Sequence, residues 1–128
     1  MRLLLDTHAF LWWVFDDPKL STAARELISD PGTEILFSVV SAWKIAIKAR
    51  AGRLDLPADI RRFIVGQLRV NGFVTLPVDL DHALAVHGLP DIHKDPFDRL
   101  LAAQAQTESL TLLTCDPHLR RYPIETRW

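Results

Sequence analysis

The chain is poor in cysteine, with one thiol, Cys115, among its 128 residues. A lone thiol excludes both the disulfide framework of small secreted domains and a cysteine-based zinc site. Long apolar runs are also missing, because Asp6 and His8 interrupt the N-terminal stretch MRLLLDTHAFLWWVFDD and no small-residue cleavage site follows it. We therefore expect neither a signal peptide nor a membrane span of roughly 20 apolar residues. These absences predict a cytoplasmic protein.

An excess of charge of one sign is missing too. Lys and Arg number 15 and Asp and Glu 16, which gives a formal net charge of −1. A local basic patch is nevertheless enough to bind nucleic acid. Arginines gather in three pairs, namely Arg50 with Arg53, Arg61 with Arg62 and Arg120 with Arg121. The length and the 48% of hydrophobic residues suffice for a core, and we expect a single domain over residues 1–128.

Short apolar runs alternate with helical patterns along the chain. The runs predict strands at residues 2–6, 34–40, 73–78 and 110–114. Capping residues and periodicity predict helices at 21–32, 41–52, 56–72, 79–90 and 95–109, and a short last helix from Asp116. This order predicts an α/β fold, with a parallel sheet of four to five strands flanked by helices. The helical pair between residues 41 and 72 is expected to project from the sheet or to form a dimer surface.

Three aspartates stand where a site is expected. Asp6 directly continues the first strand, Asp116 lies just past the fourth, and Asp98 begins the helix that leads into the fourth. Because sites of open α/β sheets form at the carboxyl ends of the strands, we expect these acids to converge. Carboxylates held together repel one another, whereas Mg²⁺ or Mn²⁺ accepts such oxygen ligands. The pattern therefore indicates a hard divalent cation that activates water or stabilises a phosphoryl oxygen.

Each acid also has a structural explanation. Asp98, at the third helical position, favours the positive end of the helix, and Asp95 and Asp116 resemble N-caps because each precedes a proline. Asp6 is harder to explain, since an acid that continues a buried strand is costly unless it is paired or bound to metal. Capping and a shared site both stay open. A phosphoaspartate nucleophile is disfavoured, because its second acid, two residues on, is replaced by His8.

The histidines and tryptophans are weaker candidates. His8 lies close to Asp6, but we expect a hydrogen-bonded structural role for it. The stretch DIHKDPFD (91–98) resembles a metal loop, yet its spacing matches no ligand set. Three histidines are expected at the surface or at helix ends, namely His82, His87 and His118. Three tryptophans are expected in the core or an interface, namely Trp12, Trp13 and Trp43.

Four segments of the chain, taken in order, resemble the PIN domain. They resemble more closely the VapC-type toxins of bacterial toxin–antitoxin pairs. They read LLLDTHAFLWW, SVVSAWKIAIKARAGRLDLP, DPFDRLLAAQA and LTLLTCD. The resemblance implies a PIN-like three-layer sandwich and a Mg²⁺- or Mn²⁺-dependent endoribonuclease that cleaves RNA phosphodiester bonds. It also implies a homodimer and a cognate VapB-type antitoxin, whose tail packs on an apolar groove and places a basic side chain near the acids.

The resemblance maps the catalytic and metal-binding acids of the family onto Asp6, Asp98 and Asp116. Thr7 and Thr114 match hydroxyl positions beside these acids, where they are expected to orient the acids or their waters. One position departs from the family pattern WEIAIK, because this chain reads WKIAIK and has Lys44 in place of the glutamate.

Lys44 is expected to point from its helix toward the acids. A unit positive charge about 5 Å from a divalent ion opposes it by roughly 6–7 kcal/mol at an effective dielectric constant of about 20. A lysine head that swings into water reduces this repulsion. We therefore predict weakened metal binding and low or absent nuclease activity. Two function classes stay open: a ribonuclease toxin, active or disabled by one residue, and a non-catalytic PIN-like module that binds RNA or an antitoxin.

Overall fold

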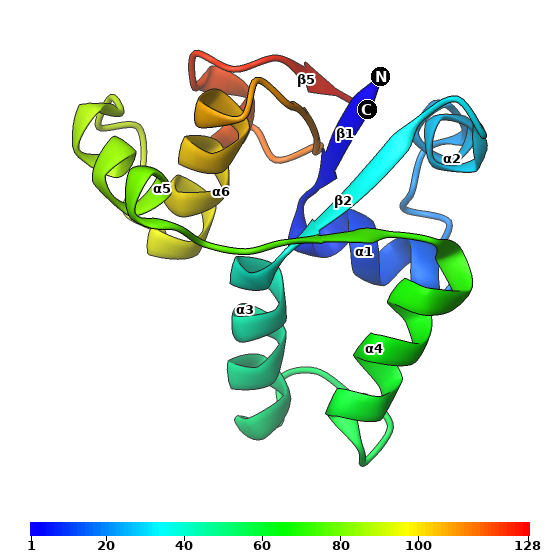
Figure 1. Ribbon diagram of the computed structural model, residues 1–128. Helices are drawn as coiled ribbons and strands as arrows, with labels where there is room; N and C mark the ends of the chain where they lie inside the picture. Colours follow the sequence, from blue (N-terminus) through cyan, green and yellow to red (C-terminus); the bar gives the residue numbers. More distant parts are fainter.

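The computed structural model describes residues 1–128 and contains a five-stranded parallel sheet with helices on both faces (Figure 1). The strand order is β3-β2-β1-β4-β5, and every neighbouring pair is parallel. The strands are β1 (Arg2–Leu5), β2 (Glu34–Ser38), β3 (Val74–Leu76), β4 (Thr111–Leu113) and β5 (Thr126–Arg127). The predicted α/β fold with a parallel sheet of four to five strands is confirmed.

Six α-helices connect the strands. They are α1 (Thr7–Val14), α2 (Thr22–Ser29), α3 (Val39–Arg50), α4 (Ile60–Asn71), α5 (Leu80–Ala85) and α6 (Pro96–Thr107). Two 3₁₀ turns complete the chain, at Val86–Gly88 and Leu119–Arg121. None of the helices combines the length and the hydropathy needed to cross a bilayer.

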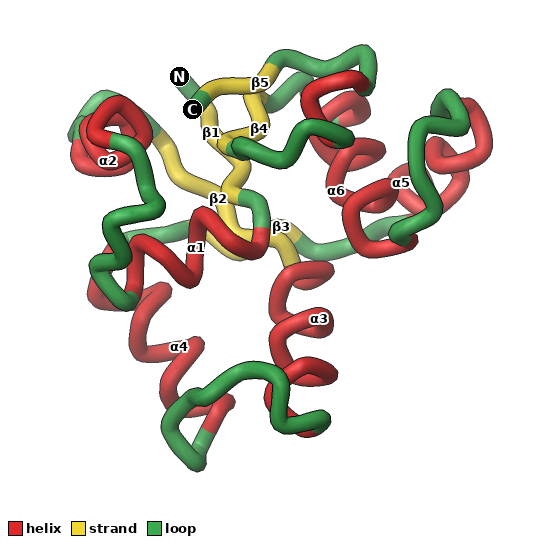
Figure 2. Tube along the Cα trace, turned by 180° about the vertical axis from the view of Figure 1, so that it is seen from behind, coloured by secondary structure: helices red, strands yellow, loops and turns green.

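The central strand β1 shows how the sequence divides the core into two layers. Leu3 and Leu5 pack in a cluster with residues of α1, α2 and α4, whereas Leu4 packs in a second cluster with residues of α6. Successive side chains of a strand point to opposite faces, so a strand covered on both faces is apolar at every position. Figure 2 shows the resulting layers, with α1, α2 and α4 on one side of the sheet and α5 and α6 on the other.

Several boundaries differ from the predicted ones because side chains cap the helices. The strand expected over 34–40 ends at Ser38, whose hydroxyl accepts a hydrogen bond from the Val40 N–H and so begins α3. The helix expected from Pro57 begins only at Ile60, after the N-cap Asp59. The helix expected over 79–90 ends as α5 at Ala85 and continues as a 3₁₀ turn, and the short last helix is also a 3₁₀ turn.

Helices α3 and α4 leave the sheet together. In Figure 1 they extend side by side beyond the carboxyl ends of β1 and β2, which is one of the two arrangements expected for this segment. The return to the sheet uses Gly72, which ends α4 with φ of 68°, a left-handed conformation that glycine adopts without strain. We call residues 39–71 the α3–α4 arm.

Candidate active site

Asp6 lies at the junction of β1 and α1, at the carboxyl end of the sheet. Its backbone N–H donates to the carbonyl oxygen of Leu113 in β4 at 3.1 Å, which places the residue between two strand ends. Its carboxylate accepts a hydrogen bond from the Ala9 N–H at 2.7 Å and so caps α1. Capping therefore fixes the orientation of the side chain.

Capping does not compensate the charge of Asp6. The side chain is only 5% exposed, and this burial raises its pKa to about 6. The charges of Asp98 and Asp116 raise the pKa further, while hydrogen bonding from Thr114 and from the Ala9 N–H opposes the rise. Asp98 and Asp116 thus both lie close enough to Asp6 for their charges to disfavour its ionised form, as expected for converging acids.

Asp98 is held from two sides. It occupies the third position of α6 and is 8% exposed. One carboxylate oxygen, Oδ1, lies 3.6 Å from Lys44 Nζ, and the other, Oδ2, lies 3.2 Å from His93 Nε2. His93 Nδ1 lies 2.8 Å from the hydroxyl of Tyr122, which accepts a hydrogen bond from Arg99 at 3.1 Å. This chain of contacts fixes the plane of the Asp98 carboxylate.

Lys44 reaches from α3 to the start of α6, toward the acids. Its ammonium donates to Asp95 Oδ2 at 3.3 Å, and only 11% of its side chain is exposed. Asp95 is also the predicted N-cap of α6, because its Oδ1 accepts hydrogen bonds from the N–H groups of Phe97 and Asp98. Burial favours the neutral acid, but these hydrogen bonds and Lys44 together hold the pKa of Asp95 below its usual value.

The other expected site residues are placed differently from one another. Asp116 follows β4, and its Oδ1 accepts a hydrogen bond from the His118 N–H at 2.8 Å. The Thr114 hydroxyl accepts a hydrogen bond from the backbone N–H of Asp116 at 3.0 Å. The same side chain lowers the pKa of Asp6 by hydrogen bonding, so it links Asp6 to the backbone of Asp116. Thr7 instead donates to the Ser41 hydroxyl at 2.9 Å, which ties α1 to α3. The structure shows no hydrogen bond from Thr7 to an acid.

Three histidines lie in different surroundings. His8 is exposed and stacks on Trp12 at 5.4 Å between ring centroids, so the hydrogen-bonded structural role expected for it is wrong. His82, expected at the surface or at a helix end, lies in the first turn of α5 as part of its capping box, but it is buried, at 1% exposed. His93 belongs to the site through Asp98, a contact that its spacing from Asp98 did not indicate. The exposed ring of Trp43, by contrast, leaves an interface role open.

A second group of acids and a base lies at the start of α5. One oxygen each of Asp79 and Glu108 and a ring nitrogen of His82 lie within 4.8 Å of one another, as metal ligands do. His82 Nδ1, however, accepts the Asp79 N–H, while the Asp79 carboxylate accepts the His82 N–H. His82 Nε2 contacts Glu108 at 2.9 Å. Both ring nitrogens are therefore already used, and a capping box explains this group.

The acids at the sheet edge suit a hard divalent cation in their chemistry. Asp6, Asp98 and Asp116 offer carboxylate oxygens, which Mg²⁺ and Mn²⁺ prefer. A cation beside Asp6 would favour the ionised form that its burial disfavours. The Lys44 ammonium already supplies one positive charge at Asp98. The three acids therefore offer the ligand chemistry of such an ion, with Lys44 beside one of them, although the α5 group is the one whose ligand atoms all lie within 4.8 Å of one another.

Comparison with known proteins places the chain in a family. The PIN domain family matches residues 3–125. Ribonuclease VapC16 of Mycobacterium tuberculosis is 35% identical over 111 residues, or 84% of this chain and 74% of the relative. Ribonuclease VapC22 of the same organism is 28% identical over 121 residues, or 94% and 91%.

The fold comparison agrees with the sequence relatives. A crystal structure of VapBC2 from Rickettsia felis, bound to a DNA fragment from their promoter, matches with a TM-score of 0.75 at 15% identity. That match covers 99% of this chain and 98% of the other chain. At this identity it shows the fold alone. The family match and the VapC relatives together establish that this chain belongs to the PIN domain family, in its VapC-type branch.

Proposed function

We propose that this chain is the endoribonuclease toxin of a toxin–antitoxin pair, with a divalent metal site at Asp6, Asp98 and Asp116 and an activity held low by Lys44. The observation that carries the proposal is the largely buried side chain of Lys44, whose ammonium contacts both Asp95 and Asp98. Two M. tuberculosis relatives named as VapC ribonucleases support the reaction class. We take residues 1–128 as one PIN domain that works in the cytoplasm.

The acids have distinct roles in this proposal. Asp6 and Asp98 are metal ligands, and Asp116 adds a third carboxylate from the loop that follows β4. Bound Mg²⁺ or Mn²⁺ supplies an activated water and charge stabilisation for the phosphodiester. Thr114 keeps Asp6 and Asp116 in register through its hydroxyl. The hydrogen bond from the Ala9 N–H holds Asp6 in place before RNA arrives, and the His93 contact does the same for Asp98.

Lys44 lowers activity through charge and through contact. Its ammonium neutralises part of the negative charge of the acids and so weakens their attraction for the divalent metal ion. It also holds one carboxylate oxygen of Asp98 at 3.6 Å. Since its side chain is largely buried, the ammonium is less free to swing into water than an exposed lysine.

A Lys44→Glu variant tests the proposal. With Mg²⁺ or Mn²⁺ supplied, we expect it to cleave RNA at least about 100-fold faster than the original chain, which corresponds to only about half of the estimated repulsion. Lys44→Ala separates removal of the ammonium from addition of a ligand and should fall between the two. Adding Asp98→Asn to Lys44→Glu should abolish the gain. Equal cleavage by the original chain and Lys44→Glu would overturn the role of Lys44.

The second candidate is a non-catalytic PIN module that binds RNA or an antitoxin. The Lys44 contacts favour it, because the ammonium stabilises the cluster without any metal. The Lys44→Glu variant distinguishes the two candidates. A module that has lost catalysis for further reasons would stay inactive after this substitution, whereas a toxin disabled at one position would regain cleavage.

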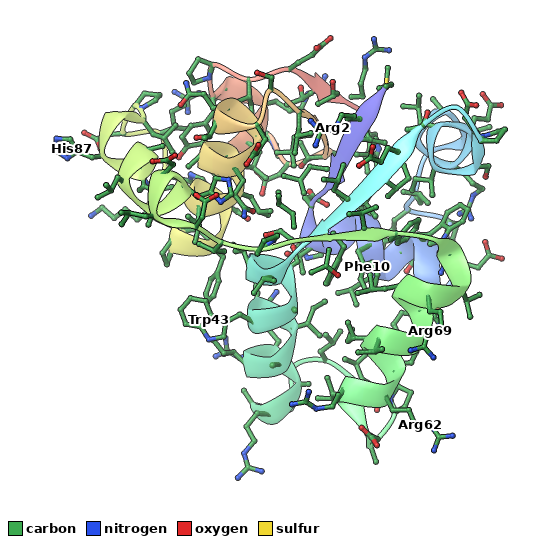
Figure 3. The ribbon with its side chains drawn as sticks, viewed as in Figure 1. Arg2, Phe10, Trp43, Arg62, Arg69 and His87 are labelled. Atoms are coloured by element: carbon green, nitrogen blue, oxygen red, sulfur yellow. The ribbon has the colours of Figure 1, made fainter.

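A homodimer and a VapB-type antitoxin are the proposed partners. Apolar side chains are exposed on α3 and α5, which both pack against α6, and they comprise Val39, Trp43, Ile47, Leu80 and Leu84. Trp43 is 58% exposed, and Figure 3 shows it pointing outward from α3. The solved VapBC complexes of R. felis and Haemophilus influenzae support an antitoxin partner.

The dimer surface has its own test. Leu84→Glu should convert a dimer to a monomer in light scattering after size exclusion, because it places a charge in the apolar face. Val70→Glu, on an even more exposed apolar residue of α4, is the matched control and should leave the mass unchanged. A monomeric original chain would exclude the proposed dimer.

A further inference from the structure

Charge is distributed unevenly along this nearly neutral chain. The α3–α4 arm has seven Lys and Arg residues against two Asp, a net charge of +5, while the remainder has eight bases against 14 acids, a net charge of −6. An acidic centre repels the phosphates of a nucleic acid. A nuclease with such a centre therefore needs positive charge elsewhere to attract its substrate.

Six of the seven basic side chains of the arm are free of acidic partners. Lys44 alone forms ion pairs there, with Asp95 and Asp98. The ion pairs of Arg2 and Arg25 lie outside the arm. The other six bases have no carboxylate within 4.0 Å, and all but Lys48 are exposed; they are Lys48, Arg50, Arg53, Arg61, Arg62 and Arg69.

Three of these arginines surround a hollow on α4. The hollow has a volume of about 460 Å³, and Arg61, Arg62 and Arg69 line it. Gly66 forms part of its floor, where an added Cβ would have no neighbour within 4 Å. Arg62 and Arg69 lie seven residues apart on one helix face, or about 10 Å along the axis. In Figure 3 both side chains project from the same outer side of α4.

The composition of the hollow favours a phosphate backbone over a protein segment. Val65 is its one apolar lining residue, so a docked peptide would bury little apolar surface. Guanidinium groups bind phosphate oxygens in pairs of parallel hydrogen bonds. The one acid of the hollow, Asp59, uses a carboxylate oxygen to cap α4 through the Arg62 N–H.

We propose that the outer face of α4, with Arg62 and Arg69 around Gly66, binds the phosphate backbone of RNA at a distance from the acidic centre. This inference rests on the proposed function for the class of ligand. The arm connects the two sites, because α3 contacts Asp98 through Lys44 and α4 carries the arginine face. A contact of this kind increases affinity without touching the scissile bond.

The test is binding of a fluorescently labelled RNA hairpin, measured by anisotropy in EDTA so that cleavage does not occur. Arg62→Gln with Arg69→Gln should weaken binding about 10-fold and lower the slope of log K against log salt by about 1.5, as expected for two lost phosphate contacts. Arg2→Gln with Arg127→Gln removes the same charge at the sheet and is the matched control. It should change affinity less than 3-fold.

Other outcomes separate this inference from the proposed function. If Lys44→Glu fails to cleave RNA but binding depends on Arg62 and Arg69, the nuclease proposal fails and the binding surface stands. If both double variants weaken RNA binding equally, or neither does, the inference is wrong. It is also wrong if the α4 variant loses affinity only for a poly-glutamate peptide, because the surface would then serve an acidic protein.

Discussion

Two groups of this molecule bring a buried base together with acids, and they differ in how completely local structure explains them. At the start of α5, His82 and Asp79 exchange hydrogen bonds with each other's backbone, and Glu108 takes the remaining ring nitrogen. At the sheet edge, Asp6 caps α1 but remains buried with its pKa raised, and Lys44 supplies a positive charge to Asp98 from another helix.

The difference separates a group that stabilises the fold from one that strains it. Both ring nitrogens of His82 in the α5 cluster have a partner close in sequence or at the end of the adjacent helix, so loss of this cluster is expected to affect stability. The sheet-edge acids are held together at an electrostatic cost that no local hydrogen bond removes. Clusters of that kind are more common at functional sites.

The largest expected stability effect comes from Asp6→Asn. The pKa of Asp6 is about 6 in the folded protein against an ordinary 3.8, so the folded state binds this proton more tightly than the unfolded state. Protonated Asp6 therefore contributes to the free energy of unfolding below about pH 4, and this contribution is lost as the pH rises through about 6. Without metal, Asp6→Asn should therefore be up to about 3 kcal/mol more stable than the original chain at pH 7.5.

Urea unfolding in EDTA at pH 4 and pH 7.5 measures this difference. The gain should be present at pH 7.5 and small at pH 4, where Asp6 is protonated in both states. Asp55→Asn, on an exposed loop residue of the arm, should show no such pH-dependent gain. A gain of equal size at both pH values would contradict the assignment to Asp6 ionisation.

The opposite effect is expected from His82→Ala. Removing this buried ring leaves a cavity, opens the capping box and leaves Glu108 without its contact, which together should cost about 2 kcal/mol of unfolding free energy. His87→Ala, on the exposed residue labelled in Figure 3, should change stability by less than about 0.5 kcal/mol. Mn²⁺ affinity of the sheet-edge site should be unchanged in both, and a loss in His82→Ala would contradict the separation of the two clusters.

A smaller and purely functional effect is expected from His93→Gln. Tested in the Lys44→Glu background, loss of the His93 contact should lower kcat about 10-fold with little change in KM, because Asp98 is held less well. Tyr122→Phe removes only the next hydrogen bond in the chain and should lower kcat less. A rise in KM with kcat unchanged would show instead that His93 acts in RNA binding.

Much of the fold could be predicted because β1 and β2 are buried on both faces. Their sequences RLLL and EILFS are apolar runs of strand length, and a parallel sheet follows from their alternation with helices. Strand β5 is not predictable from the sequence, because its two residues, Thr126 and Arg127, carry no periodic signal. It forms through pairing with β4. Boundaries moved by a few residues where a capping hydrogen bond, as at Ser38, decides the first helical residue.

The candidate site could be predicted only in part, for a similar reason. Asp6 and Asp116 follow strand ends, so topology alone brings them together. The approach of Lys44 to the acids was expected through the family resemblance alone, and no local pattern indicated its contact with Asp95 or that of His93 with Asp98. Burial of His82 likewise depends on α6 packing against α5, which the short segment 79–90 did not indicate.

The central claim is that the Lys44 ammonium competes with a divalent cation for the acidic cluster, and Mn²⁺ binding tests it most directly. Isothermal titration of the original chain and of Lys44→Glu measures the two dissociation constants without RNA. We expect Lys44→Glu to bind Mn²⁺ at least about 100-fold more tightly, a difference of about 3 kcal/mol, and to lose this gain when Asp98→Asn is added. Equal affinity of the original chain and Lys44→Glu would contradict the account.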